Sequence, residues 1–476
     1  MKNRSLKLNA ILNTITQLSA ILLPFVTFPY VTRVLETTNY GKVTFGNSIV
    51  SYFSIFAALG IATYAIREGA AIRDDRKKTE QFVSELFSFN MVSTAIAYIG
   101  LFLLLLLWKE KAPYRTLIAI QSITVLANTL GIAWLYTIYE DYLFIAIRSI
   151  LIQLLSLVAV FVFIKSPEDY VLYAVIGVAG GVLNNLLNIV FARKYVRLRF
   201  VPLLNFKTYI KPILILFASS ALITVYLSAD VTMLEIMKGD SDVGIYEVAV
   251  KIYTIVKSIL NAVITVTIPR FAYYIGIKDM ENYRKLSKST FESIVLLTLP
   301  ALIGLIMVAP NVILIMSGES YLPGTWSLRI LSVALIFAVM ANFFVNGLLL
   351  AFKRDRLILF GTVLSAIVNV GLNFIFIPKW GMNGAAITTL IAEALIMLVG
   401  IIGSRDVFYG RGVWKTIVTV VLGMGVIVAV CLGVDLLNLS LWPDTLLKVG
   451  ISVVAYGGLL LLMRRDLVKS FLKRGK

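Results

Sequence analysis

The chain has 476 residues, of which 59% are hydrophobic and only 15% are charged. Soluble globular proteins carry a charge on about 25% of their residues, whereas apolar stretches of roughly 20 residues, long enough to cross a bilayer, recur throughout this sequence. The net charge of +18 lies in short clusters between those stretches. This pattern excludes a soluble nucleic-acid-binding protein and indicates an all-α polytopic membrane protein.

Fourteen membrane spans are predicted. The first is read as a retained span because its apolar run is long and lacks a clear small-residue cleavage site. In chain order the spans cover residues 10–32, 43–66, 82–108, 115–137, 143–164, 170–192, 210–234, 244–268, 289–316, 325–351, 357–377, 383–403, 413–437 and 445–463. The single cysteine, Cys431, falls in an apolar segment, so no disulfide framework is expected.

The basic residues predict the orientation of these spans. Of the 44 lysines and arginines, 32 fall on the side of the N-terminus, 10 on the opposite side and two inside spans. If one span had been missed, every later loop would be assigned to the opposite side of the membrane, and the basic residues would no longer concentrate on one side. Because basic residues concentrate in cytoplasmic loops, both termini are predicted to be cytoplasmic in a cell (inner) membrane protein.

An internal repeat predicts the domain organisation. When Gly41 is aligned with Gly244, an offset of 203 residues, Arg67 and Arg270 also coincide. The offset equals six spans, so the copies run in the same direction, as in transporters built from parallel repeats. We therefore expect an N-terminal lobe at 1–205, a C-terminal lobe at 206–404, and two extra spans with a basic tail at 405–476.

Polar residues recur on one face of the eighth span, at spacings of three and four that align them on a helix. The stripe consists of Glu247, Lys251, Thr254, Ser258, Asn261 and Thr265, and Lys257 lies beside it. A lysine near mid-bilayer costs roughly 2.5–3.5 kcal/mol on insertion scales. A stripe facing a water-filled cavity would avoid that cost.

Two interpretations of the stripe remain open. In the first, Glu247 and Lys251 form an ion pair that only holds helices together, which leaves Lys257 without an acidic residue within one turn. In the second, the stripe is the cationic lining for an anionic substrate. Under the second interpretation the substrate-binding candidates are Lys251, Lys257, Arg33, Asn261, Thr254 and Ser258.

Other charged residues lie at the ends of predicted spans. Arg33 and Asp230 fall at outer ends, while Arg67, followed by Glu68, and Arg270 fall at repeat-related inner ends. The candidates for gating or ion pairing are Arg67, Glu68, Arg270, Glu247 and Asp230. The alternative for these positions is simple snorkelling to the membrane interface.

Glu393, in the twelfth span, could bind a coupling cation, Na⁺ or H⁺, although a helix-to-helix hydrogen bond explains it equally well. The chain has no histidine, and Gly41-Lys42 lacks the upstream glycine of a phosphate-binding loop. Asp240-Ser241-Asp242 matches the D-x-D of metal-using glycosyltransferases, but an acidic external loop explains so short a motif. We therefore predict no catalytic residues, no bound cofactor and no metal site.

Three segments resemble the polysaccharide transporter family, the oligosaccharide repeat-unit flippases, whose superfamily also holds multidrug and toxin extruders and lipid II flippases. The segments are Phe28–Leu35 with Tyr40-Gly41, Ala229-Asp230 with Val243–Tyr246, Ala249 and Lys251, and Leu372–Pro378 with Gly381, Gly384–Thr389 and Glu393. The third is the most specific, and their order extends the resemblance over most of the chain.

The resemblance implies two six-helix lobes around a central cavity, with two added helices. It also implies a substrate of oligosaccharide linked to undecaprenyl pyrophosphate, moved by alternating access for surface polysaccharide assembly. The partners would be this lipid-linked oligosaccharide, membrane lipids and glycan-assembly proteins such as a polymerase, with no nucleic acid. Lys251, Lys257 and Arg33 would replace the hydration of the pyrophosphate.

Three alternatives remain. A multidrug extruder of the same superfamily would be expected to carry acidic cavity residues rather than lysines. A membrane-embedded polymerase or glycosyltransferase needs a substantial external loop or an acidic cluster, and neither is visible in the sequence. A lipid II flippase should show its own signatures near the N-terminus, and these match poorly.

Overall fold

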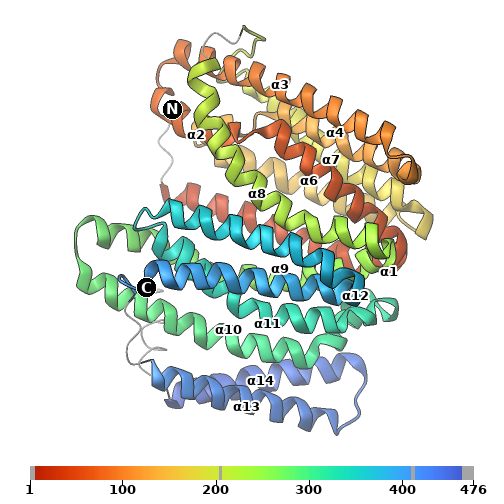
Figure 1. Cartoon of the computed structure of the whole chain (residues 1–476), viewed down its shortest axis with the longest axis vertical. Helices are drawn as coiled ribbons and strands as arrows, with labels where there is room; N and C mark the ends of the chain where they lie inside the picture. Colours follow the sequence, from red (N-terminus) through yellow and green to blue (C-terminus); the bar gives the residue numbers. More distant parts are fainter. Residues whose placement is uncertain (1–5, 203–205, 409–412, 464–476) are drawn as a thin grey trace. The chain divides into compact units, whose positions relative to one another are not determined.

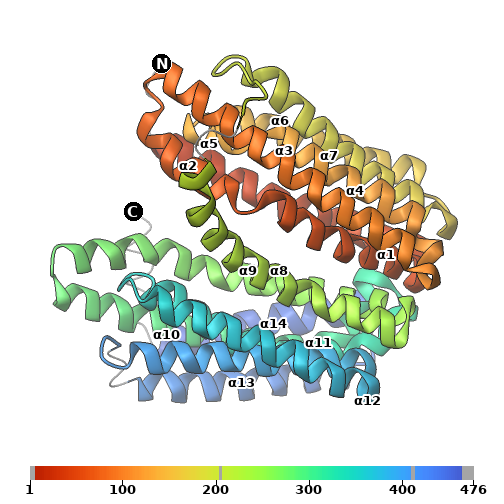
Figure 2. The same ribbon diagram turned by 45° about the horizontal axis from the view of Figure 1, so that its top comes forward.

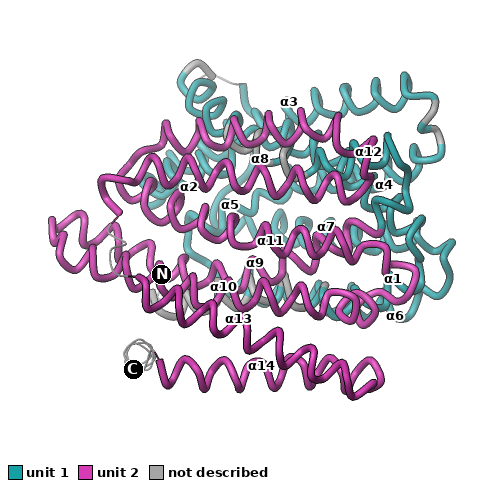
Figure 3. Tube along the Cα trace, turned by 60° about the horizontal axis from the view of Figure 1, so that its bottom comes forward, with its two compact units in different colours: residues 1–244 teal, residues 245–476 magenta. Residues whose placement is uncertain are grey.

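The computed structural model describes residues 6–202, 206–408 and 413–463, and all of its regular elements within those ranges are helices. The chain forms two compact units, residues 1–244 and 245–476, shown in teal and magenta in Figure 3. Helix α8 therefore belongs to the first unit. The predicted division at residues 205 and 404 stays a prediction.

The first unit is a helical bundle built around its first helix. α1 packs against α3, α4, α6 and α8, and α4 packs against α7; Figure 2 shows α3, α4, α6 and α7 running alongside one another. The elements are α1 (Leu6–Ala58), α2 (Ile61–Ile72), α3 (Arg76–Leu107), η1 (Lys109–Tyr114), α4 (Arg115–Gly131), α5 (Trp134–Ile138), α6 (Tyr142–Phe163), η2 (Pro167–Asp169), α7 (Tyr170–Ala192) and α8 (Phe206–Lys238).

The second unit packs around α10 and α11. α12 packs on α11, and the C-terminal pair α13 and α14 packs on α10 and on each other (Figure 1). The elements are α9 (Asp240–Gly276), whose first residues belong to the first unit, α10 (Met280–Ser317), η3 (Glu319–Gly324), α11 (Thr325–Asn342), a π-helical segment η4 (Phe343–Leu349), α12 (Asp355–Ser404), α13 (Trp414–Asp435) and α14 (Leu441–Met463).

The predicted fold class, an all-α polytopic membrane protein, is confirmed. Within the described ranges, 11 helices are long and apolar enough to cross a membrane. This number is smaller than fourteen partly because α1 and α12 each cover two predicted spans. Every predicted span is largely helical, although two of them, 43–66 and 115–137, each cross a break between helices, and the predicted link at 138–142 lies where α5 gives way to α6.

The first long helix is interrupted twice. The break expected between spans 1 and 2 lies at Glu36, where non-helical backbone with a φ of 60° separates two helical arms. A second interruption, which was not predicted, falls inside the predicted span 43–66, where Leu59 and Gly60 have φ values of 45° and 74°. A Cβ on Gly60 would lie 2.9 Å from Cβ of Leu216 in α8, so both the left-handed backbone and the close helix contact favour glycine there.

The two glycines that anchor the repeat, Gly41 and Gly244, face each other in the first unit. A Cβ on Gly41 would lie 1.9 Å from the carbonyl oxygen of Asp240, and one on Gly244 would lie 2.0 Å from that of Thr37. The side chain of Ser241 also donates a hydrogen bond to Thr37, at 3.0 Å. The start of α9 is therefore packed backbone to backbone against α1.

This contact predicts a destabilised Gly41→Ala variant. Because the atoms that obstruct it, the carbonyl group of Asp240, are backbone, the helices must separate to admit a methyl group, and overpacking of this kind costs roughly 1–3 kcal/mol. Gly425→Ala is the matched control, since no heavy atom lies within 4 Å of the Cβ it would add. We expect the midpoint of thermal unfolding in detergent to fall for Gly41→Ala only. Equal midpoints for the two variants would refute this packing.

Candidate functional site

The polar stripe of the predicted eighth span lies on α9. Its hydroxyl groups are partly used within the helix, because Ser258 donates to the carbonyl oxygen of Thr254 at 2.8 Å and Thr265 donates to that of Asn261 at 3.1 Å. Such bonds satisfy the hydroxyl donor while leaving an acceptor lone pair. Thr254 is itself exposed. These side chains can therefore accept hydrogen bonds from a ligand at no cost to the helix.

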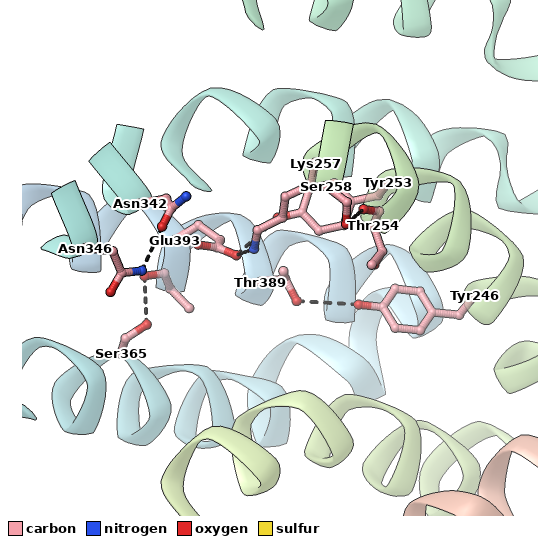
Figure 4. Close-up of polar contacts among 11 residues, drawn as sticks. Tyr246, Tyr253, Thr254, Lys257, Ser258, Asn342, Asn346, Ser365, Thr389 and Glu393 are labelled. Atoms are coloured by element: carbon pink, nitrogen blue, oxygen red, sulfur yellow. Dashed lines mark hydrogen bonds and ion pairs between the residues drawn. The ribbon is translucent and has the colours of Figure 1, made fainter. Parts of the chain in front are cut away.

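Lys257 does have an acidic partner, on a helix far away in the sequence. Its ammonium lies 2.5 Å from the Oε1 carboxylate oxygen of Glu393 in α12, and the hydroxyl of Tyr253 donates to the same oxygen at 3.1 Å (Figure 4). Glu393 is 7% exposed, and 28% of the Lys257 side chain is exposed. The ammonium also lies 5.3 Å from the Tyr253 ring centre, a favourable cation–π distance.

The surroundings of Glu393 are rigid. Within α12, Thr388 donates to Asn373 at 2.5 Å and Ser365 donates to the carbonyl oxygen of Ala392 at 2.8 Å, so the two arms of the helix are joined across its kink. The kink itself lies at Gly381, with a φ of 54°. Because this network fixes the backbone beside Glu393, the carboxylate is held at the ammonium of Lys257.

A π-helical segment, η4, borders the same region. It packs against α12. Asn346, inside it, donates to Asn342 at 2.7 Å, and Figure 4 draws both amides together with Glu393 and Ser365. Segments of π-helix are uncommon and occur frequently at functional sites. The sequence gives no signal for this segment, because its hydrophobic pattern continues that of α11.

Lys251 differs from Lys257. In the described part of the chain, its side chain makes no hydrogen bond and no ion pair, and the side chain is partly buried. The predicted alternative of a Glu247–Lys251 ion pair does not occur among the described residues. Lys251 attracts the Glu247 carboxylate on the same helix without contacting it. α9 therefore carries one lysine in direct contact with a carboxylate of a neighbouring helix and one that makes no ion pair in the described chain.

Among the remaining predicted residues, Arg67, Glu68 and Arg33 have local contacts of their own. Arg67 pairs with its neighbour Glu68 at 2.8 Å on the surface of α2, and Arg33 donates to the carbonyl oxygen of Pro29, one turn earlier, at 3.1 Å. Asp230 is buried in α8 at 8% exposure, and Arg270 is exposed near the end of α9. Their assignment to gating stays a prediction.

An ion-pair cluster in the first unit was not predicted. Lys111 lies 2.5 Å from the buried carboxylate of Glu235, and the Tyr114 hydroxyl contacts both that carboxylate, at 3.1 Å, and Asp240, at 2.7 Å. Asp240 of the D-x-D motif thus belongs to a contact that joins η1 to α8 and α9. Sequence spacing cannot reveal it, because the partners are more than a hundred residues apart.

A second charged contact lies outside the spans of the second unit. The guanidinium of Arg354, at the start of α12, bonds both carboxylate oxygens of Asp406, at 2.7 and 2.5 Å, and also the carbonyl oxygen of Gly403. This charged hydrogen bond lowers the pKa of Asp406 to about 2. The pair therefore stays ionised at neutral pH and ties the two ends of α12 together.

A pocket of about 460 Å³ in the first unit was also missed by sequence reasoning. It lies between α1, α4, α6 and α7, and the described side chains that line it include amides and hydroxyls but no charged group. Within the described chain, Asn47, Gln153 and Asn184 make no side-chain hydrogen bond, and Gln121 uses only its amide nitrogen, which donates to the Val43 carbonyl at 3.0 Å. Gly177 also lines the pocket, and a Cβ there would meet no heavy atom within 4 Å.

Two known proteins that this chain resembles in sequence are named as a transporter and a flippase. The chain is 25% identical over 403 residues to a candidate O-antigen transporter of Escherichia coli (strain K12), covering 82% of this chain and 95% of that protein. It is also 25% identical over 166 residues to a candidate low-salt glycan biosynthesis flippase of Haloferax volcanii, covering 35% of each protein.

Solved structures show the same fold at low sequence identity. A lipid II flippase in an inward closed conformation has a TM-score of 0.78 at 15% identity, covering 96% of this chain and all of that one. An inward-facing multidrug resistance transporter of the MATE family has a TM-score of 0.59, also at 15% identity, over 81% and 94% of the two chains.

A family model assigns the chain directly. The model for polysaccharide biosynthesis proteins matches residues 6–275, more than half of the sequence. The match includes two of the three segments on which the predicted resemblance rests, and the matched region ends within α9, after the polar stripe. This multi-pass membrane protein therefore belongs to the polysaccharide biosynthesis protein family.

Proposed function

We propose that this protein is a flippase that moves lipid-linked oligosaccharide repeat units to the outer leaflet for surface polysaccharide assembly. Its family, its transporter and flippase relatives and its fold support transport of this kind. The observation that carries the proposal is Lys251. It is a partly buried cation on a spanning helix that makes no ion pair in the described chain and only attracts Glu247 from beyond contact distance. Such a cation is costly unless an anion or water meets it.

The proposed substrate is an oligosaccharide on undecaprenyl pyrophosphate, and the proposed mechanism is alternating access. A pyrophosphate cannot cross hydrocarbon bare, because transfer of an unpaired charge costs tens of kcal/mol in the ideal limit. Lys251 would supply the compensating charge. Lys257, held by Glu393, would join it if a coupling proton or cation neutralised that carboxylate.

The uncharged pocket of the first unit supports the oligosaccharide part of the proposal. Its volume falls in the range of small-molecule sites and far exceeds the ~30 Å³ that a water molecule occupies. Sugars present many hydroxyl groups, each a donor and an acceptor, and Asn47, Gln153 and Asn184 offer unused amides of both kinds. A lining without charge suits neutral sugar rings.

Filling this pocket should impair export. Gly177→Leu would extend a side chain into the pocket without striking a neighbouring helix near its Cβ, so the protein should fold normally and export at least about tenfold less glycan, since one lost polar anchor is worth about 1.4 kcal/mol. Gly304→Leu is the control, because its Cβ also meets nothing within 4 Å, in the second unit. Undiminished surface glycan in Gly177→Leu cells would exclude the pocket from the transport path.

Disruption of the gene tests the proposed function as a whole. We expect cells without the protein to lose the surface polysaccharide and to accumulate its lipid-linked repeat unit, which can be extracted and identified by mass spectrometry. Re-expression of the protein in these cells must restore the surface polysaccharide and remove the accumulated repeat unit. Loss of polysaccharide without accumulation of the intermediate would instead indicate a role in synthesis.

Cysteine labelling tests the proposed orientation, with both termini in the cytoplasm. In a Cys431→Ser background, Glu168→Cys in η2 and Ile277→Cys after α9 are both exposed positions outside the predicted spans. An impermeant maleimide should label the first in intact cells and the second only after permeabilisation. The reverse pattern would invert the topology, and labelling of both in intact cells would mean that the number of spans between them is even.

A further inference from the structure

An arginine without a counter-ion lies inside the first unit. Arg148, in α6, is 6% exposed, and its Nε and Nη1 atoms are buried with no hydrogen-bond partner among the described residues. Its described neighbours are aromatic: its guanidinium carbon lies 5.2 Å from the ring centre of Phe144 and 6.0 Å from that of Tyr136. Arginine stays protonated inside proteins, so this charge needs compensation from outside the described chain.

A pocket of about 490 Å³ adjoins the guanidinium. Asp141 also lines it, but its carboxylate is already occupied: the Tyr195 hydroxyl donates to it at 2.6 Å and Lys194 pairs with it at 3.3 Å. The charges of Asp141 and Lys194 therefore balance. The pocket is left with one uncompensated positive charge, that of Arg148.

Part of the pocket wall is apolar and exposed at the outside of the bundle. Ile147, Leu151 and Phe191 line it and are 52%, 56% and 48% exposed. In a protein that spans a membrane, large apolar side chains exposed in this way suit contact with acyl chains. The predicted topology places the start of α6 and the end of α7 at the cytoplasmic leaflet, where anionic lipids are concentrated.

We propose that this pocket binds the phosphate of an anionic phospholipid. The remaining guanidinium nitrogen, Nη2, which is not among the buried atoms, would donate a charge-assisted hydrogen bond to a phosphate oxygen, while an acyl chain lies along Leu151 and Phe191. A free phosphate offers the same oxygens, but it would gain nothing from the apolar walls. The site is separate from the transported substrate and does not depend on the proposed function.

Native mass spectrometry of the purified full-length protein tests this assignment, with phosphatidylglycerol and phosphatidylcholine as probes. Arg148→Met replaces the buried ion with an apolar chain of similar length, so it should fold at least as stably as the wild type when anionic lipid is absent. We expect it to bind phosphatidylglycerol at least about tenfold more weakly, since one charged hydrogen bond is worth 1.5–3 kcal/mol. Arg193→Met, which removes an exposed charge at the end of α7, is the matched control.

Each result of this experiment either supports or overturns the proposed lipid site. Selective loss in Arg148→Met, partial retention in Arg148→Lys, and no effect of 10 mM inorganic phosphate on lipid retention would support the proposal. Equal losses in Arg148→Met and Arg193→Met would overturn it, because they would indicate general surface attraction. Displacement of the lipid by inorganic phosphate, or equal retention of phosphatidylcholine, would overturn the assignment to an anionic lipid.

Discussion

Replacing Lys251 by alanine is expected to abolish export of the glycan while leaving normal amounts of protein in the membrane. Removing a charge that meets a desolvated partner costs about 2–5 kcal/mol, so transport should fall at least about 30-fold. Lys251 makes no ion pair within the described chain and only attracts the Glu247 carboxylate one turn away, so its loss breaks no direct contact and the fold should survive. Surface glycan, normalised to the amount of protein in the membrane, is the measurement.

Two further variants make this prediction specific. Lys251→Arg keeps the charge and should retain part of the activity. Lys415→Ala removes an exposed charge at the start of α13 and should export like the wild type. Full export by Lys251→Ala would show that this ammonium does not meet the substrate.

The second large effect concerns stability rather than transport. Lys257→Met removes the partner of Glu393 and leaves a carboxylate that is 7% exposed without its counter-ion. Breaking a buried pair from one side costs about 3–5 kcal/mol, so the variant should unfold at a clearly lower temperature. The double variant with Glu393→Gln should recover most of the loss, because the amide still accepts the hydrogen bond from Tyr253 without a charge.

The stability of the double variant tests whether Lys257 and Glu393 are paired in the folded protein. A double-mutant cycle on thermal unfolding gives the coupling between the two residues directly. If the effects of Lys257→Met and Glu393→Gln simply add, the two side chains are not paired in the folded protein. Export measured on the double variant then shows whether the pair has a role besides stability.

Much of the fold could be predicted from the sequence, because a membrane span leaves a long local signal. Runs of apolar residues predicted a helix at every span, including the one that begins at Tyr142 after a three-residue link. The break in α1 could not be placed, because it depends on the close approach of α8 to Gly60. That contact joins segments more than a hundred residues apart.

The candidate site was predictable only along a single helix. Spacings of three and four identified the polar face of α9, and both of its lysines were singled out. The partner of Lys257 was not found, because Glu393 lies 136 residues away and no periodicity connects the two. The sugar-sized pocket gave no signal at all, since its amides are uncharged and distributed over α1, α4, α6 and α7.

Arg148 shows that a count of basic residues on each side of the membrane does not reveal whether a residue is buried. It was counted among the basic residues on the predicted cytoplasmic side, which stays a prediction. The count carries no information on burial, and Arg148 is buried against the rings of Tyr136 and Phe144. Burial depends on how α5 packs on α6, which the charge pattern does not contain.

Reconstitution tests the central claim most directly. Proteoliposomes would carry the purified protein and a fluorescent oligosaccharide on undecaprenyl pyrophosphate, and an impermeant glycosidase added outside would report the accessible fraction over time. We predict that wild-type vesicles expose the substrate from the inner leaflet, whereas Lys251→Ala vesicles behave like protein-free ones. Wild-type vesicles indistinguishable from empty vesicles, or Lys251→Ala vesicles as active as the wild type, would contradict transport of this substrate past the lysine of α9.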